Sequence, residues 1–163
     1  MATVATSNLY QFQSGTPHFP GACVVLVKTE WNAGIVDELE AGCRRKLEEA
    51  GVSSVITLVV PGAVEIPFAI QQYQQKASAK ADAFVALGCV IKGDTPHFEY
   101  VCQSVTEGVT QLNLQLPVPV IFGVLTVLTD QQARERIGGA HGHKGEESAI
   151  TALKMIELSR SFQ

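Results

Sequence analysis

The stretch "ALGCVIKGDTPHFEYVC", residues 86–102, passes from a strand through a polar turn into a helix. Residues 86–91 are apolar or small without interruption, which is typical of a strand covered on both faces. Residues 92–97 combine glycine, proline and charged side chains and predict a turn. From residue 98 onward the apolar side chains recur at helical spacing. The stretch is one strand–turn–helix unit with a lysine, Gly-Asp-Thr and a histidine between its two elements.

The same unit recurs along the whole chain. Strands are predicted at residues 22–27, 53–60, 81–91 and 118–127. Helices are predicted between Asn32, the expected N-cap, and Gly51, then at 63–76, 97–116, from 129 or 130, and at 146–160, with 138–145 as a glycine-rich loop. Four alternations of strand and helix favour a parallel sheet with helices on both faces and right-handed crossovers.

The domain prediction separates a polar arm from one compact unit. Residues 1–21 are polar and rich in glycine and proline, so they are interpreted as an N-terminal arm, and residues 22–163 as a single domain. The predicted fold is α/β: a flavodoxin-like three-layer αβα sandwich with a four-stranded parallel sheet and an N-terminal arm strand.

Composition and charge exclude several function classes. The chain of 163 residues is 46% apolar and 17% charged, with a formal net charge of -4, so a general attraction to nucleic acid or an anionic membrane is not expected. Neither a secretory signal nor an apolar run of about 20 residues is visible. Cys23, Cys43, Cys89 and Cys102 form no CxxC pair and are predicted to be buried free thiols in a reducing compartment. These features predict a cytoplasmic protein.

The unusual polar and aromatic residues follow the strands. In an open parallel sheet, ligands bind at the carboxyl ends of the strands. The residues expected on that rim are 30–32, 61–65, 92–97 and 126–130, with Arg136 and Lys144 further on. The chain order of the strands therefore predicts a binding site at this edge.

Single residues on the rim each have two interpretations. Gly93 and Thr95 precede a helix whose first N–H groups attract anions, although the same residues suit an ordinary turn or N-cap. His97 could transfer protons near neutral pH or be a surface histidine. Arg136 and Lys144 are solvated charges unless a phosphate lies near them.

Glu65 and Trp31, two further residues of the rim, also have two interpretations each. Glu65 is either a first-turn charge favoured by the helix dipole or a hydrogen-bond acceptor for a ligand. Trp31, the sole tryptophan, either packs against its own helix or offers a flat surface to a planar ring. His141 and His143 lack a third ligand at metal spacing, so no metal site is expected.

Several motifs in order resemble the lumazine synthase family, the enzymes that form 6,7-dimethyl-8-ribityllumazine in riboflavin biosynthesis. The motifs are "WN" (31–32), "VPGAVEIPFA" (60–69), "ALGCVIKGDTPHFEYVC" (86–102), "PVIFGVLT" (119–126), "RERIGG" (134–139) and "HKGEESAITALKM" (143–155). The resemblance implies a transferase that condenses 5-amino-6-(D-ribitylamino)uracil with 3,4-dihydroxy-2-butanone 4-phosphate, releasing phosphate and water. It implies neither a metal nor an organic cofactor.

The resemblance also implies roles for individual residues. His97 matches the proton-transfer histidine, and Trp31 matches the aromatic position that stacks on the pyrimidine. The implied phosphate-binding residues are Asp94, Thr95 and Arg136. The other implied substrate-binding residues are Ala63, Val64 and Glu65 for the ribityl chain, Cys89, Val90 and Ile91 for the pyrimidine, and Phe122 and Lys144.

Three positions depart from the family pattern. Val64 replaces a commonly aromatic residue, which predicts a looser pocket wall. Lys92 stands where arginine is frequent, so bidentate geometry is lost. Asp94 places a carboxylate beside the predicted phosphate loop, which is unfavourable unless the side chain turns away or caps the helix.

Assembly is a further implication of the resemblance. It implies a homo-pentamer whose site lies between neighbours, with Trp31, Glu65 and His97 from one chain and Phe122, Arg136 and Lys144 from the next. The short 138–145 connection is compatible with a 60-mer of twelve pentamers, and riboflavin synthase is a candidate partner. Alternatives left open by the sequence are a non-catalytic flavodoxin-like module that binds flavin or nucleotide, a related riboflavin synthase, and a shell protein without activity.

Overall fold

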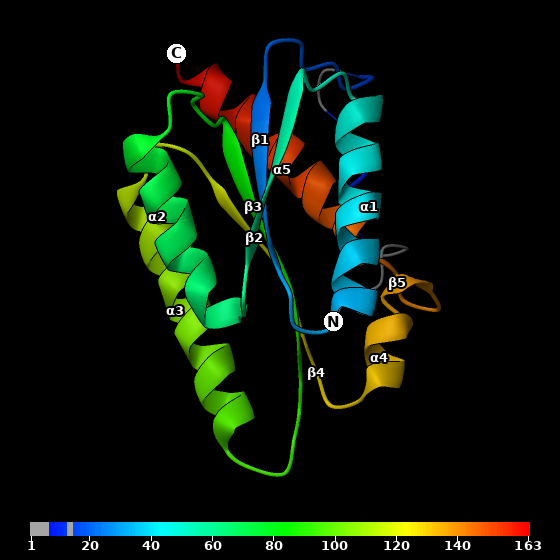
Figure 1. Ribbon diagram of the computed structural model, residues 1–163. Coiled ribbons are helices and arrows are strands. Elements are labelled where there is room, and N and C mark those ends of the chain that lie inside the picture. Colours follow the sequence, from blue (N-terminus) through cyan, green and yellow to red (C-terminus); the bar gives the residue numbers. More distant parts are fainter. Residues whose placement is uncertain (1–6, 13–14) are drawn as a thin grey trace.

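The computed structural model describes residues 7–12 and 15–163, and its centre is a four-stranded parallel sheet (Figure 1). The strands are β1 (Cys23–Thr29), β2 (Ser54–Val60), β3 (Ala83–Ile91) and β4 (Val120–Val127), in the order β2-β1-β3-β4. The helices are α1 (Ala33–Glu49), α2 (Ile66–Lys76), α3 (His97–Gln115), α4 (Asp130–Arg134) and α5 (Lys144–Ser161). A 3-10 turn, η2 (Ala63–Glu65), precedes α2, and a small hairpin, β5 (Ile137–Gly139) and β6 (Gly142–His143), precedes α5. The predicted parallel three-layer αβα fold is confirmed.

The two faces of the sheet carry separate halves of the core. Helices α1 and α5 cover one face and α2 and α3 cover the other, as Figure 1 shows. Along β1, Val24 and Leu26 pack with the first pair of helices, whereas Val25 and Val27 pack with the second. Successive side chains of a strand point to opposite faces, so an apolar run such as 22–27 must be covered on both sides.

Two glycines on α1 and α5 allow these helices to approach closely. A Cβ on Gly145 would overlap the backbone carbonyl of Leu39, and a Cβ on Gly42 would overlap the imidazole of His143. Any larger side chain at either position would push α5 away from α1. The first turn of α5 is therefore held directly against α1.

The hairpin corrects the sequence prediction for residues 138–145. These residues were expected to form a loop followed by a helix from residue 146, but β5 pairs with β6 and α5 already begins at Lys144. Gly138 and Gly142 have positive φ angles of 108° and 77°, which let the chain reverse over a few residues. Short glycine-containing strands carry no hydrophobic alternation, so the pattern could not reveal them.

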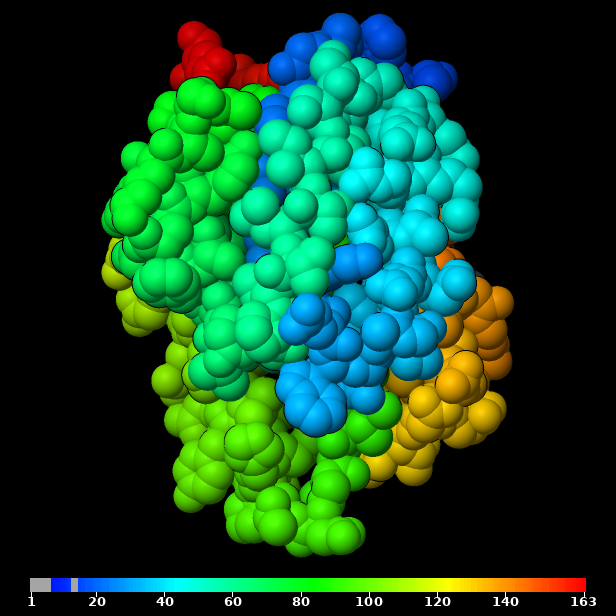
Figure 2. Space-filling view, in the orientation of Figure 1, coloured from blue at the N-terminus to red at the C-terminus, as the bar shows by residue number. Residues whose placement is uncertain are grey.

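The two outer strands leave the sheet with open edges. Strand β2 runs between α2 and α1 across the face seen in Figure 2. The side chain of Val59, in β2, is exposed. Strand β4 is the opposite edge, where Phe122 is exposed. An unpaired strand edge offers backbone donors and acceptors to another chain.

The predicted N-terminal arm is described only in part. Residues 7–12 and 15–21 form no strand within the chain, and residues 1–6 and 13–14 lie outside the described part. The arm lies against the α1–α5 side of the molecule, because Lys154 Nζ donates to the Asn8 carbonyl at 3.0 Å and Phe19 N donates to the Ala50 carbonyl at 2.8 Å. An arm strand therefore stays a prediction.

All four cysteines are free, as predicted, but the prediction that all are buried is wrong: Cys43 and Cys89 are buried, whereas Cys23 and Cys102 are partly exposed. Burial raises the pKa of Cys43 to about 12 and that of Cys89 to about 11, so both are protonated at neutral pH. Among the helices of residues 7–12 and 15–163, none is long and apolar enough to cross a membrane.

Candidate functional site

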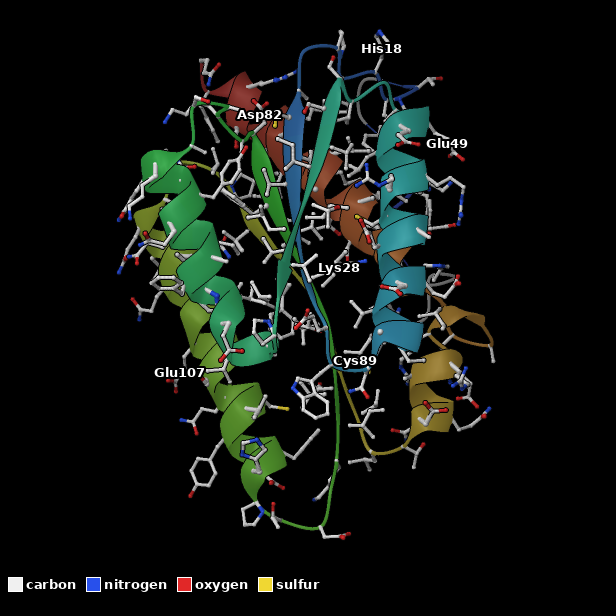
Figure 3. All side chains as sticks on the ribbon, viewed as in Figure 1. His18, Lys28, Glu49, Asp82, Cys89 and Glu107 are labelled. Carbon is white, nitrogen blue, oxygen red and sulfur yellow. The ribbon has the colours of Figure 1, made fainter. Side chains whose placement is uncertain are left out.

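A hollow of about 480 Å³ lies at the carboxyl ends of β1 and β3 and is closed by η2 and the first residues of α3. Eight of the predicted site residues line it: Trp31, Ala63, Val64, Glu65, Cys89, Val90, Ile91 and His97. Figure 3 shows Cys89 at this end of the sheet, away from Asp82 and His18 at the other. The topological expectation of a site on this rim matches the position of the hollow. We call it the β3 hollow.

The indole of Trp31 forms an exposed wall of the β3 hollow. Its exposed fraction of 74% excludes the interpretation that Trp31 packs against its own helix. The backbone of Trp31 is nevertheless fixed, since its N–H donates to the Pro61 carbonyl at 3.2 Å and its carbonyl accepts from Thr29 Oγ1 at 3.2 Å. The exposed ring is thus available to a planar partner.

Asn32 fixes the turn between β1 and α1 in a way the sequence did not reveal. It is the residue before α1, as predicted, but its side chain makes no capping hydrogen bond. Instead its Nδ2 donates to the Cys89 carbonyl at 2.8 Å, and its φ of 58° places it in the left-handed region that asparagine tolerates. The side chain therefore ties the Trp31 turn to the end of β3.

The start of α3 brings His97 to the β3 hollow. His97 is the first residue of α3, and the N-cap residue, Pro96, makes no side-chain capping hydrogen bond. The Thr95 hydroxyl accepts from the His97 N–H over a long 3.5 Å. Asp94 and Thr95 are exposed on the turn and do not line the β3 hollow.

The structure shows what the side chains of Asp94 and Lys92 do, which the sequence left open. Asp94 does not cap α3, so the capping interpretation of its carboxylate is wrong. Lys92 Nζ lies 3.2 Å from Glu99 Oε1. The hydrogen bonds to its own backbone and to Lys92 lower the pKa of Glu99, so the carboxylate stays charged and neutralises Lys92.

A second hollow of about 690 Å³ runs along β4 and beneath α5. It brings together three more of the predicted residues, Phe122, Arg136 and Lys144, with Glu147 and Ser148 beside them, whereas Asp94 and Thr95 line neither hollow. None of the residues that line it lines the β3 hollow. We call it the β4 hollow, and it divides the predicted residues into the two sets that were assigned to neighbouring chains.

The β4 hollow contains polar atoms that are incompletely paired. Arg136 Nη1 donates to the Gln132 carbonyl at 2.7 Å, but its buried Nε meets no acceptor within the described part of the chain. Lys144 Nζ donates to Glu147 Oε2 at 2.7 Å, and within residues 7–12 and 15–163 the buried Oε1 of Glu147 accepts no hydrogen bond. Buried polar atoms are normally satisfied, so this donor and this acceptor call for a partner outside the described part of the chain, whether water, a ligand or a neighbouring chain.

Sequence reasoning missed Glu147 in the β4 hollow. It expected Asn32 on the rim as the N-cap of α1, but not the hydrogen bond from its side chain to Cys89. A signal for Glu147 existed, because a carboxylate three residues after a lysine lies on the same helix face. No local pattern could assign Asn32 to Cys89, because 57 residues separate them. Within the described residues, no group of histidine, cysteine and carboxylate side chains could hold a metal ion.

Comparisons with known proteins agree on one family. The family model described as 6,7-dimethyl-8-ribityllumazine synthase matches residues 21–160. A protein of that name from Parabacteroides distasonis is 43% identical over 163 residues, covering 98% of this chain and 99% of the relative. Proteins of the same name from Porphyromonas gingivalis and Bdellovibrio bacteriovorus are 51% and 47% identical, covering 80% and 85% of this chain and 81% and 76% of the relatives.

Proposed function

Because the chain belongs to the 6,7-dimethyl-8-ribityllumazine synthase family, and is a transferase of riboflavin biosynthesis, we propose that its active site consists of the β3 hollow of one chain and the β4 hollow of a neighbour. The reaction joins 5-amino-6-(D-ribitylamino)uracil to 3,4-dihydroxy-2-butanone 4-phosphate and releases phosphate and water. The observation that carries the site assignment is the grouping of the predicted residues into these two hollows.

The β3 hollow takes the pyrimidine substrate. Stacking on Trp31 suits a planar uracil, since the indole is 74% exposed while its backbone is fixed. The walls at Cys89, Val90 and Ile91 are apolar, and the turn of residues 63–65 provides backbone groups and the Glu65 carboxylate for the ribityl hydroxyls. The exposed Val64 gives this wall a smaller side chain than the aromatic residue that is common at this position.

The phosphate of the second substrate lies between the start of α3 and Arg136 of the neighbour. The first N–H groups of α3 and the Thr95 hydroxyl attract an anion, and Asp94 contributes its backbone, since its side chain neither caps nor lines the hollow. Arg136 provides the unpaired Nε–H as a charge-assisted donor. Phe122 and Lys144 complete the wall on the neighbour's side.

His97 transfers protons between the two substrates. Condensation of the amine with the ketone requires a proton for the departing hydroxyl, and loss of phosphate requires removal of a proton from carbon. An imidazole serves both steps near neutral pH and contributes about 10²–10⁴-fold in rate. Alignment of the two substrates contributes up to about 7–11 kcal/mol, so positioning outweighs the histidine.

The proposal includes an assembly. A homo-pentamer, with an arm of residues 1–21 on each domain of residues 22–163, places a β4 hollow beside a β3 hollow at each contact. Exposed apolar side chains at both sheet edges, such as Val59 and Phe122, support burial against other copies. Twelve pentamers forming a 60-mer, riboflavin synthase as a partner, and a cytoplasmic location belong to the same proposal.

Mixing the protein with both substrates tests the reaction directly. We expect lumazine absorbance to appear together with one phosphate for each lumazine. Product without phosphate release, or consumption of added lumazine in place of its formation, would contradict the assignment.

A further inference from the structure

His143 stands at the head of α5, directly before Lys144. It is the N-cap of this helix, with extended backbone angles (φ -123°, ψ 100°), and its Nδ1 accepts the N–H of Glu146 at 3.4 Å. An N-cap side chain needs an acceptor atom for this purpose, and imidazole has one only while a ring nitrogen is unprotonated. The cap of α5 therefore depends on the protonation state of His143.

The imidazole is also wedged between three elements. It occupies the space beside Gly42 of α1 that a Cβ at this position would fill. A Cβ on Gly138 of β5 would lie 3.7 Å from its Cδ2, and its backbone pairs with Ile137. The ring thus contacts α1 and the hairpin while it caps α5.

The backbone connects this ring to the two cations of the β4 hollow. Lys144 follows His143 directly, and the Lys144 N–H donates to the Arg136 carbonyl at 2.8 Å. Lys144 Nζ in turn pairs with Glu147 one turn along α5. A shift of the α5 head would therefore displace Lys144, Glu147 and the Arg136 backbone together.

We propose that His143 is a positioning residue: its neutral imidazole keeps the first turn of α5 in place, so that Lys144 and Arg136 face the substrate phosphate. Protonation of the ring frees this turn. The proposal rests on the assignment of Arg136 and Lys144 to the active site. It adds a pH-sensitive support that lies outside both hollows.

The charges around the ring favour its neutral form on balance. Burial lowers the pKa of His143, Glu146 on α5 raises it, Arg45 on α1 lowers it and Glu38 on α1 raises it, with the net direction downward from 6.5. Residues 137–139 of β5 carry no charged side chain. An imidazolium would also place a positive charge at the positive end of the helix dipole.

The sign of the pH effect follows from the lowered pKa. The unfolded chain takes up a proton at a higher pH than folded His143 does, so the contribution of the neutral ring is complete above 6.5. It is lost as the pH falls from there through the folded pKa. The window of interest therefore lies below pH 6.5.

Hydrogen exchange measured without substrates tests whether the neutral His143 ring stabilises the first turn of α5. We compare the wild type with His143→Asn, whose Oδ1 caps the helix without titrating, and with His141→Asn, which removes an exposed imidazole from the same hairpin. Between pH 7.5 and 5.5, exchange across residues 143–148, read by mass spectrometry, should rise about 3- to 10-fold in the wild type relative to His143→Asn measured at the same pH. His141→Asn should follow the wild type. Equal pH dependence in the wild type and His143→Asn overturns the proposal.

Steady-state kinetics test the link to the site. The ratio of wild-type KM to His143→Asn KM for 3,4-dihydroxy-2-butanone 4-phosphate, taken at each pH, cancels the pH dependence that the two proteins share. It should rise about 3-fold or more by pH 5.5 while the kcat ratio stays constant. A flat KM ratio with pH-dependent exchange overturns the positioning role. If Arg136→Ala also leaves this KM unchanged, the assignment of Arg136 to the site has failed as well. Should His143→Asn not fold, His143→Ser offers an equivalent cap and serves as its replacement.

Discussion

Arg136 has one buried N–H group, at Nε, that meets no acceptor in the described part of the chain. If a phosphate is its partner, Arg136→Ala removes a charge-assisted hydrogen bond, which contributes about 1.5–3 kcal/mol. We expect KM for the butanone phosphate to rise about 10- to 100-fold, and KM for the pyrimidine substrate to change little. Initial rates with each substrate varied in turn measure both constants.

Arg134 offers a matched control for this variant. It lies two residues earlier, is more exposed, and pairs with Asp130 at 2.6 Å. Arg134→Ala should leave both KM values unchanged, because the pair lies on the surface of α4. An Arg136→Ala enzyme with normal affinity for the butanone phosphate would remove Arg136 from the site.

Proton transfer by His97 is expected to add to a larger rate acceleration that comes from the alignment of the two substrates. His97→Ala should lower kcat by no more than about 10²–10⁴-fold and leave measurable turnover, with substrate binding retained. Stopped-flow absorbance gives the rate, and His141→Ala, at an exposed imidazole outside both hollows, is the control. Complete loss of turnover with both substrates still bound contradicts the ranking of positioning above proton transfer.

Sequence reasoning identified candidate site residues where an unusual residue type follows a strand end. It did not identify contacts between residues that lie far apart in the chain. Trp31 and Glu65 follow strand ends and were expected on the rim, where the β3 hollow includes them. The bond from Asn32 to Cys89 joins two separate strand ends, so it depends on the folded sheet and leaves no local pattern. Glu147 was missed because charged residues in a helix are usually solvated.

Helices α1 and α5 meet where Gly145 lies against the Leu39 backbone. Gly145→Ala should destabilise the fold by about 1–3 kcal/mol through overpacking, measured by denaturant unfolding. Gly34→Ala on α1 is the control, because a Cβ there meets nothing within 4 Å. That substitution should be neutral or stabilising by up to about 1 kcal/mol. A Gly145→Ala protein as stable as the wild type would contradict the close crossing.

At the scale of elements, some helix boundaries can be predicted from single residue types in the sequence. The stop at Gly51, with φ 72°, and the start of α4 at residue 129 or 130 were predicted from residue type, and the structure adds that Thr129 Oγ1 accepts from Gln132 N at 3.2 Å. The β5–β6 hairpin was not, because its strands are too short to alternate. Its pairing depends on contacts with α1 and α5, which the sequence does not display locally.

At the scale of the whole molecule, the division of the site predicts complementation between variants. Glu65→Ala alters the β3 hollow and Arg136→Ala alters the β4 hollow, and each assembly of one kind should be weakly active. Co-expression of the two should restore intact sites at about a quarter of the contacts in a random mixture. Assays of purified mixed assemblies measure this recovery. If both hollows of one chain served the same site, the mixture would show only the average of the two variants.

The mass in solution separates the assemblies. Chains of 17.5 kDa give a pentamer of roughly 90 kDa and a 60-mer of about 1 MDa. We expect light scattering to report one of these values, and a monomer would contradict the shared site.

The overall architecture was the most predictable feature, because each apolar run must be covered on both faces and each crossover has one favoured hand. The separation of the site into two hollows came from the resemblance to a family. Periodicity within one chain describes what that chain buries, and it carries no information about the surface of a neighbour.

The Asn32 amide has one more consequence, which concerns the cost of binding. Since it anchors the indole-bearing turn to the sheet, a pyrimidine bound as proposed meets a stacking platform that is already ordered. Affinity is then not reduced by the entropy of organising a loop. Calorimetry of pyrimidine binding should show this as a more unfavourable entropy in Asn32→Ala than in the wild type, with the stacking enthalpy largely kept.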